Sequence, residues 1–109
     1  MKPEILEIHS FKKSVKKLAK KYKRFADDYE GLINTLELGN HNAVDLGDNF
    51  YKIRLKNSSS NQGKSGGFRI VYFFKALDNE IYLLDIFSKS DIDTIKKPVL
   101  QAMIEKYVG

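Results

Sequence analysis

Several features are missing from the 109-residue sequence, and each absence narrows what the protein can be. There is no cysteine, which excludes disulfide bonds and thiolate metal sites. Cysteine usage therefore does not indicate whether the protein works in an oxidising or a reducing compartment. No apolar run approaches membrane-spanning length, and the first ten residues lack the apolar core of a secretory signal. We therefore expect a cytoplasmic protein without a membrane partner. No repeat or linker divides the chain, and its length predicts one domain over residues 1–109.

The motifs of common enzyme sites are also missing. The sequence has no Walker loop, no nucleophile elbow and no dinucleotide fingerprint. Its two histidines, His9 and His41, are far apart, and a structural role suits each of them better than catalysis. The run GKSGG at 63–67 resembles a phosphate-binding loop only superficially, because a strand and not a helix is expected after it. We expect neither a metal nor a cofactor.

Positive charge is abundant, with a net charge of +5 and a pI of about 9.3. Such a balance favours polyanionic partners. Many of the positive charges lie in a predicted helix over residues 11–24, where the charged residues around an apolar stripe are all basic. The basic residues are Lys12, Lys13, Lys16, Lys17, Lys20, Lys21, Lys23 and Arg24. They form either an ordinary solvated face or a surface that binds phosphates, and the absence of acidic i,i+4 partners favours the second slightly.

Apolar spacing predicts the remaining elements. A short strand over 5–8 precedes the first helix, for which Ser10 is a plausible N-cap. A second helix is expected over 25–38, a polar loop over 39–49, strands over 50–56, 68–75 and 80–87, and a helical region that ends near 107. Pro98 either kinks this last helix or begins it. The order predicts an α+β fold: an antiparallel sheet with an N-terminal helical hairpin packed on one face, and a C-terminal helix.

Strand alternation predicts a cluster of cations on the uncovered face of the sheet. In the strand over 50–56, Tyr51, Ile53 and Leu55 face one way, whereas Lys52, Arg54 and Lys56 face the other. Arg69 of the next strand is expected beside them. Like charges on one sheet face repel, so the cluster suits a bound phosphodiester, whose charge Arg and Lys stabilise.

Asp85 bears on this cluster in two ways. In the alternative interpretation, Asp85 and other acids neutralise the cations. Alternation places Asp85 with Ile81, Leu83 and Phe87, but the opposite set is equally apolar, so hydrophobicity does not decide which set faces inward.

The runs FYKIRLK, GGFRIVYFF and IYLLDIFSKSDI resemble the conserved block of the RelE/ParE superfamily of type II toxin–antitoxin toxins. The pattern GK-x-GG-x-R-I-[hydrophobic]-Y, here at 63–72, is most similar to the HigB-like branch of RelE toxins. The resemblance is specific over residues 50–92 and looser over the helical hairpin and first strand. It implies a ribosome-dependent mRNA endonuclease that binds in the 30S A site. There the 2′-hydroxyl of the mRNA attacks the adjacent phosphate without a metal, and a cognate antitoxin neutralises the toxin.

The same resemblance assigns roles by position. Lys52 and Arg54 match the basic pair of the RelE strand, with Lys52 as general base. Arg69 matches the arginine that holds the scissile phosphate, and Lys89 follows the last strand, where RelE has a second basic pair. Further RNA contacts are expected from Lys56, from Lys64 in the long loop, and from Lys16, Lys20 and Lys23. Two positions depart from RelE, because Ser90 stands for a basic residue and Lys96 lies near the position of a tyrosine.

Two other functions remain open. One is a ParE-like toxin of the same fold, which inhibits DNA gyrase and cuts no RNA. The other is an RNA-binding module without activity. The antitoxin could cover the basic sheet face or could bind the helices, and the sequence does not choose between these modes.

Overall fold

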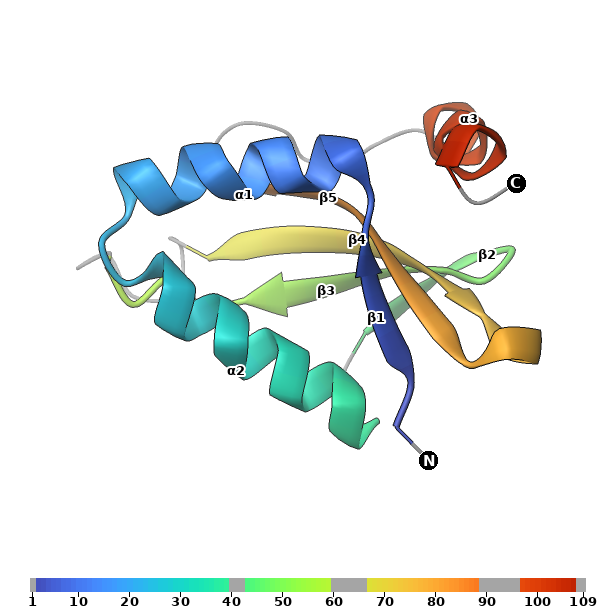
Figure 1. Cartoon of the computed structure of the whole chain (residues 1–109), viewed down its shortest axis with the longest axis horizontal. Coiled ribbons are helices and arrows are strands. Elements are labelled where there is room, and N and C mark those ends of the chain that lie inside the picture. Colours follow the sequence, from blue (N-terminus) through green and yellow to red (C-terminus); the bar gives the residue numbers. More distant parts are fainter. Residues whose placement is uncertain (1, 40–42, 60–66, 89–96, 108–109) are drawn as a thin grey trace.

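The structure is a computed structural model that describes residues 2–39, 43–59, 67–88 and 97–107. Its elements in chain order are β1 (Glu4–Glu7), α1 (His9–Lys21), α2 (Phe25–Leu38), β2 (Val44–Gly47), β3 (Phe50–Leu55), β4 (Phe68–Lys75), the 3-10 turn η2 (Ala76–Asp78), β5 (Glu80–Ser88) and α3 (Lys97–Tyr107). The strands form one sheet in the order β1-β5-β4-β3-β2 (Figure 1). The predicted α+β class is confirmed.

Most of the sheet is antiparallel, as predicted, but β1 is an exception. β2 pairs with β3, β3 with β4 and β4 with β5 in antiparallel register. β1 pairs with β5 in parallel, with Glu4 opposite Glu80 and Glu7 opposite Leu83. A parallel neighbour needs a long connection, and the chain from α1 to β4 supplies it.

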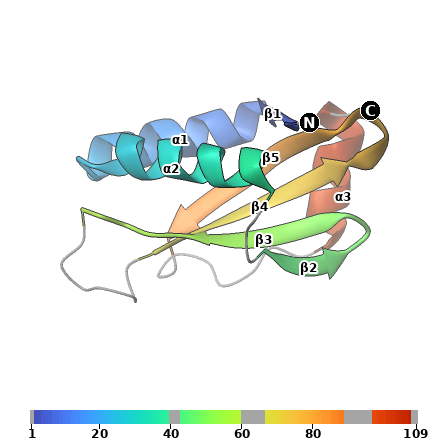
Figure 2. The same ribbon diagram turned by 90° about the horizontal axis from the view of Figure 1, so that it is seen from below.

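The helical hairpin covers one face of the sheet (Figure 2), and α1 and α2 diverge from the turn that joins them (Figure 1). Phe11 of α1, Phe25 of α2 and Phe68 of β4 are 0%, 1% and 0% exposed. Burial of each such ring contributes about 2–3 kcal/mol to folding. The rings of Phe25 and Phe68 meet edge to face, with centroids 5.3 Å apart. The aromatic core therefore joins the hairpin to the N-terminal end of β4.

The ends of the two helices correct part of the prediction. α1 begins at His9, and Ile8 occupies the N-cap position. Ser10 is not the cap, because its hydroxyl donates to the carbonyl of Leu84 across the interface with β5, at 3.4 Å. α1 ends at Lys21, so Lys23 lies in the turn beyond it. α2 has its predicted bounds, and it is capped by Gly39, whose φ of 74° is left-handed.

β2 lies within the predicted polar loop. It is four residues long and turns into β3 through Gly47, Asp48 and Asn49, which have φ values of 89°, 55° and 68°. Asn and Asp tolerate this conformation better than most residues. The Asp45 carboxylate also accepts the N–H of Gly47 at 2.8 Å. A strand this short carries too little alternation to stand out from the polar residues around it.

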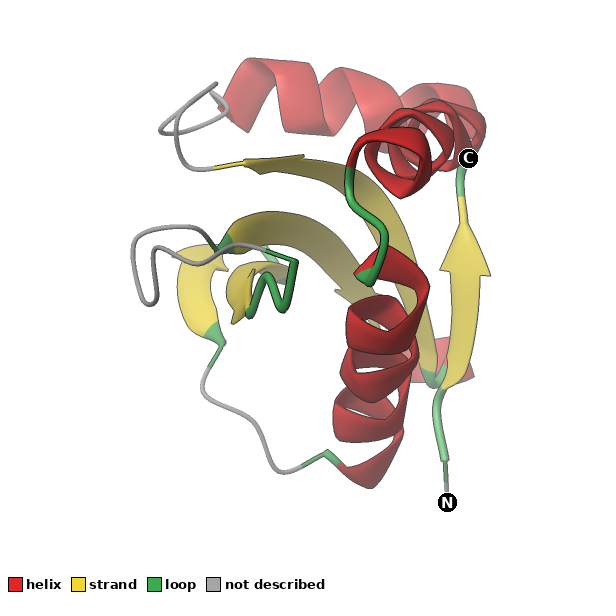
Figure 3. Ribbon diagram, turned by 90° about the vertical axis from the view of Figure 1, so that its left-hand side faces the viewer, coloured by secondary structure: helices red, strands yellow, loops and turns green. Residues whose placement is uncertain are grey.

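α3 stands apart from the hairpin, and β5 runs between α3 and α2 in the view of Figure 3. Pro98 lies in its first turn, so this proline begins the helix and does not kink it. Leu100 is 1% exposed and belongs to the hydrophobic core. Phe50 and Val71, which share a face with the predicted cations, are also buried. The face opposite the hairpin is therefore only partly open, which corrects the expectation of an uncovered face.

Candidate functional site

The predicted cations meet where β3 and β4 pair. Arg54 lies directly opposite Arg69, and Lys52 lies opposite Val71 two residues along, so all three share one face. Arg54 is exposed, whereas Lys52 and Arg69 are half-buried. Lys56 follows the end of β3 and is exposed. The grouping expected from alternation is thus present in the register.

Arg69 is held by the residues on either side of it. The ring of Phe68 packs edge to face against both Tyr22 and Phe25, each at 5.3 Å, which anchors the backbone beneath the hairpin. On the other side, a Cβ added to Gly67 would lie 2.9 Å from the Leu55 carbonyl oxygen, 3.6 Å from Arg69 and 3.7 Å from Arg54. Only glycine fits this close approach of the two strands without movement. The two guanidinium groups therefore project from a rigid part of the sheet.

The electrostatics of the pair suit an external anion. Burial, followed by repulsion from Arg54, lowers the pKa of Arg69 from its ordinary value. Arg69 donates a long hydrogen bond of 3.4 Å to the carbonyl of Phe68. Among the residues that the structure describes, no carboxylate forms an ion pair with Lys52, Arg54 or Arg69. An oxyanion could accept bonds from both guanidinium groups.

Asp85 does not neutralise the cluster. β5 has a bulge, because Val71 pairs with Asp85 but Tyr72 pairs with Leu83, and Leu84 is the extra residue. The bulge places Asp85 on the face of Tyr82 and Phe87, which corrects the expected grouping with Ile81 and Leu83. Its carboxylate accepts the hydroxyl of Ser14 at 3.1 Å and the N–H of Ile86 at 2.8 Å. Burial raises its pKa, and its role is to join β5 to α1.

The lysines of α1 form a separate basic surface. Lys16 and Lys20 are exposed and line a hollow of about 510 Å³ together with Lys13, Ser14 and Lys17. Lys23 is exposed in the turn after the helix. Lys21 lies over the ring of Tyr22, 5.4 Å from its centroid. Lys16, Lys20 and Lys23 are therefore exposed to solvent, but they do not join the cluster of Arg54 and Arg69.

The sequence interpretation missed an anchor beside the cluster. The N–H and hydroxyl of Ser58 donate to the two carboxylate oxygens of Asp28, at 2.8 and 2.5 Å. The N–H of Arg24 donates to the Ser59 hydroxyl at 2.8 Å. Asn57 is 5% exposed and accepts the N–H of Ser59 at 3.0 Å. These bonds tie the chain after Lys56 to the hairpin. The run Asn-Ser-Ser, with its capacity for local turns, was the available signal.

Several predicted site residues lie outside the described residues. They are Lys64, Lys89, Ser90 and Lys96, together with His41. His9 is exposed at the start of α1. Within the described ranges, no group of three or more His, Cys, Asp or Glu side chains could hold a metal ion. In the same ranges, no helix is both long and apolar enough to cross a membrane.

Comparison with known proteins bears on identity. Residues 8–106 match the family model described as the RelE toxin of the RelE/RelB toxin–antitoxin system. A solved structure of the E. coli toxin RelE, with two arginines replaced by alanine and in the free state, has a TM-score of 0.62 and 17% identity. The match covers 97% of this chain and 98% of that chain. No curated protein matches the sequence. The structural likeness shows the fold, and the family model, which spans most of the chain, shows that the protein belongs to the RelE toxin family.

Proposed function

We propose that the protein is a ribosome-dependent mRNA endonuclease of the HigB-like branch, which cuts translated mRNA in the 30S A site. One observation carries the proposal: Arg54 and Arg69 are paired directly across two strands, Lys52 shares their face, and no carboxylate of the described chain forms an ion pair with them. Like charges so placed destabilise the sheet, and a phosphodiester bound between them would offset that repulsion.

In the proposed reaction, the 2′-hydroxyl of one nucleotide attacks its own 3′-phosphate. Lys52 accepts the proton of the hydroxyl, a new bond forms between the 2′-oxygen and phosphorus, and the bond to the 5′-oxygen of the next nucleotide breaks. The leaving 5′-oxygen takes up a proton from water, so the products are a 2′,3′-cyclic phosphate and a 5′-hydroxyl. Arg69 and Arg54 stabilise the charge that develops on the phosphate oxygens. We assign Lys89 to the same site as a further cation, on the resemblance alone.

The remaining basic residues would hold the larger partner. We propose that Lys16, Lys20 and Lys23 contact ribosomal RNA, and that Lys56 and Lys64 contact mRNA. Such phosphate contacts weaken as salt rises. The site needs no cofactor for this reaction, because the attacking group belongs to the substrate. The toxin would act in the cytoplasm, where a cognate antitoxin neutralises it.

Primer extension on a translated message with purified ribosomes tests the proposal. The wild type should cut within the A-site codon, and Arg69→Ala should reduce cleavage by roughly 10²–10³-fold, the effect of losing one donor to an oxyanion. Circular dichroism and the Tm should show that the variant folds. A folded Arg69→Ala protein that cuts at the wild-type rate would exclude the phosphate-binding role. Intact mRNA together with accumulated gyrase–DNA adducts would instead identify a gyrase inhibitor.

A further inference from the structure

Lys56 is held between two buried residues. It follows β3 directly and is itself exposed, whereas Leu55 before it and Asn57 after it are 8% and 5% exposed. Alternation along the strand puts Lys56 on the face of Arg54, two residues further along the chain. The backbone of Lys56 is therefore fixed on both sides, and its charged side chain projects from a defined point beside Arg54.

Asp28 of α2 fixes the chain that follows Lys56. Its two carboxylate oxygens accept hydrogen bonds from Ser58, one from the N–H at 2.8 Å and one from the hydroxyl at 2.5 Å. The hydroxyl of Ser59 adds a second tie, because it accepts the N–H of Arg24 at 2.8 Å. Hydrogen bonds to an ionised group are roughly twice as strong as those between neutral groups. In Figure 1, the arrowhead of β3 points toward the turn between α1 and α2, near which these bonds form.

The charge of Asp28 works against phosphate binding. Asp28 lines the hollow of about 360 Å³ between β3 and α2, together with Asp27, Arg54 and Lys56. An acid that shares a hollow with cations lowers their affinity for an anion. In the part of the chain that the structure describes, however, neither Asp27 nor Asp28 forms an ion pair with these cations. The bonds to Ser58, and not charge pairing, therefore explain why an acid stands at position 28.

The anchor made by Asp28 fixes a position more than it adds stability. Residues 57–59 are Asn-Ser-Ser, so they bury no apolar side chain. The net gain from a few hydrogen bonds is roughly offset by the entropy lost when the backbone is ordered. A polar network whose members are satisfied makes a segment rigid and specifies one arrangement of it.

We propose that Asp28, acting through Ser58, is a positioning residue that holds Lys56 where it binds the phosphate next to the scissile one. Arg54 and Arg69 take the scissile phosphate. Lys56 stands about 6.6 Å further along the strand, a distance comparable to one nucleotide of an extended single strand. A lysine side chain is long and flexible, and a fixed backbone lowers the entropy that it loses on binding. The inference rests on the proposed function, which supplies the mRNA.

The first test compares two neighbouring acids of α2. Asp28→Ala and Asp27→Ala remove the same charge from the same hollow, but both bonds of Ser58 go to Asp28. The probe is a short, fluorescein-labelled single-stranded RNA with 2′-O-methyl groups, which cannot be cut, and fluorescence anisotropy measures its Kd. Loss of a negative charge alone should tighten binding, by up to about twofold for Asp27→Ala.

Asp28→Ala should change the affinity in the opposite direction. We expect it to bind the RNA about three- to tenfold more weakly, although it makes the protein more positive, because Lys56 is no longer held in place. Tighter binding by a folded Asp28→Ala protein, as for Asp27→Ala, would mean that the residue acts through its charge alone and would overturn the proposal.

The second test asks whether Asp28 acts through Lys56. Lys56→Ala should weaken binding and reduce the slope of log Kd against log salt by about 0.7, the value for one phosphate contact of a single strand. In the Lys56→Ala background, Asp28→Ala should weaken binding no further. An equal weakening with and without Lys56 would show that Asp28 supports the fold only, contrary to the positioning role.

A milder variant controls for folding. Ser58→Ala removes one of the two bonds to Asp28 and leaves every charge in place. It should keep its Tm and bind the RNA about twofold more weakly, again only while Lys56 is present. Should Asp28→Ala fail to fold, this pair of measurements decides: wild-type affinity in Ser58→Ala, or a loss that persists without Lys56, would contradict the proposal.

Failure of the positioning role is distinguishable from failure of the proposed nuclease. In the primer-extension assay, Asp28→Ala should raise KM and leave kcat near the wild-type value, because the phosphate next to the scissile one does not react. A wild type that cuts no mRNA would exclude the nuclease, while the binding comparisons still decide the role of Asp28. A wild type that cuts mRNA but binds the uncut RNA no better than Lys56→Ala does would exclude the positioning role alone.

Discussion

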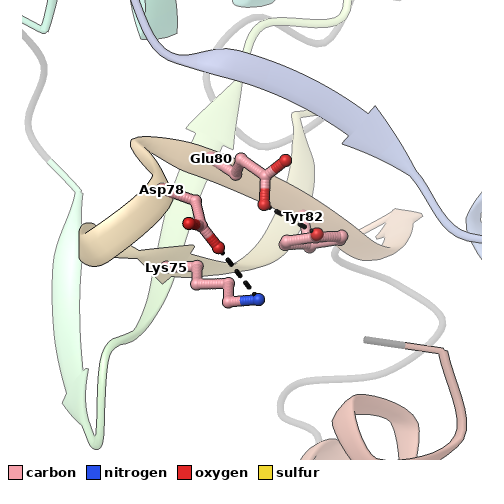
Figure 4. Close-up of polar contacts among 4 residues, drawn as sticks. All are labelled: Lys75, Asp78, Glu80 and Tyr82. Carbon is pink, nitrogen blue, oxygen red and sulfur yellow. Dashed lines mark hydrogen bonds and ion pairs between the residues drawn. The ribbon is translucent and has the colours of Figure 1, made fainter. Parts of the chain in front are cut away.

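At the C-terminal end of β4, Lys75 forms an ion pair of 3.0 Å with Asp78, and Glu80 lies opposite it on β5 (Figure 4). The hydroxyl of Tyr82 donates to Glu80 at 2.9 Å. At the N-terminal end of the same strand, Arg69 faces Arg54, and neither forms an ion pair with a described acid. The hydrogen bond and charge of Asp78 raise the pKa of Lys75, whereas burial and Arg54 lower that of Arg69.

The difference separates a cation that is paired within the fold from one that, under the proposed function, stays available to a phosphate. Lys75 ends β4, and two acids that lie three and five residues further along the chain, Asp78 and Glu80, complete its surroundings. Arg69 has a rigid aromatic support but no partner of opposite charge in the described chain. A site that binds an external anion must leave its own cations unmatched, and the fold bears the resulting repulsion.

The largest expected effect is on mRNA cleavage, and it compares a lysine of the cation cluster with Lys75 at the C-terminal end of β4. Lys52→Ala should slow cleavage in the primer-extension assay by roughly 10²-fold, because it removes the proposed general base. Lys75→Ala is the matched control, a lysine-to-alanine change on the same sheet, and should cut at the wild-type rate. Equal loss in the two variants would mean that overall charge, and not position, governs activity.

A second variant breaks the close approach beside the cluster. Gly67→Ala should lower the free energy of unfolding by about 1–3 kcal/mol, because the new methyl group would press on the Leu55 carbonyl. Urea denaturation measures this. Gly31→Ala, in open space, should instead raise the stability by up to about 1 kcal/mol. If Gly67→Ala were as stable as the wild type, the two strands would have room that the structure does not show.

A third variant relieves the repulsion. Arg54→Gln should raise the free energy of unfolding by a few tenths of a kcal/mol, since it removes a like charge directly opposite Arg69. The gain should shrink in high salt, which screens exposed charges. Urea titrations at low and high salt measure both effects. A loss of stability would show that Arg54 contributes more through packing than it costs through repulsion.

The smallest effect is expected at the other end of β4. Asp78→Asn removes an ion pair between two partly exposed side chains, and such pairs contribute little. The Tm should change by about 3 °C or less, as measured by thermal denaturation. A larger drop would mean that the turn around Lys75 depends on charge more strongly than an exposed pair allows.

The strand periods correctly predicted which cations share a face of the sheet. Alternation over residues 50–56 and 68–75 was enough to put Lys52, Arg54 and Arg69 on one face, and the register confirms it. The position of Asp85 could not be predicted, because Leu83 and Leu84 are equally apolar and the bulge between them leaves no mark in the pattern. The predicted N-cap of α1 was wrong because the Ser10 hydroxyl donates to the carbonyl of Leu84, which is remote in sequence.

By itself, the sequence determined the helical hairpin, the three long strands and the surplus of cations, because helix and strand periods depend on residues close along the chain. Only the tertiary structure decided which charged residues lie next to one another. It set Arg54 opposite Arg69 and brought Asp85 within hydrogen-bonding distance of Ser14. These outcomes depend on register and packing between segments far apart in sequence, which local pattern does not encode.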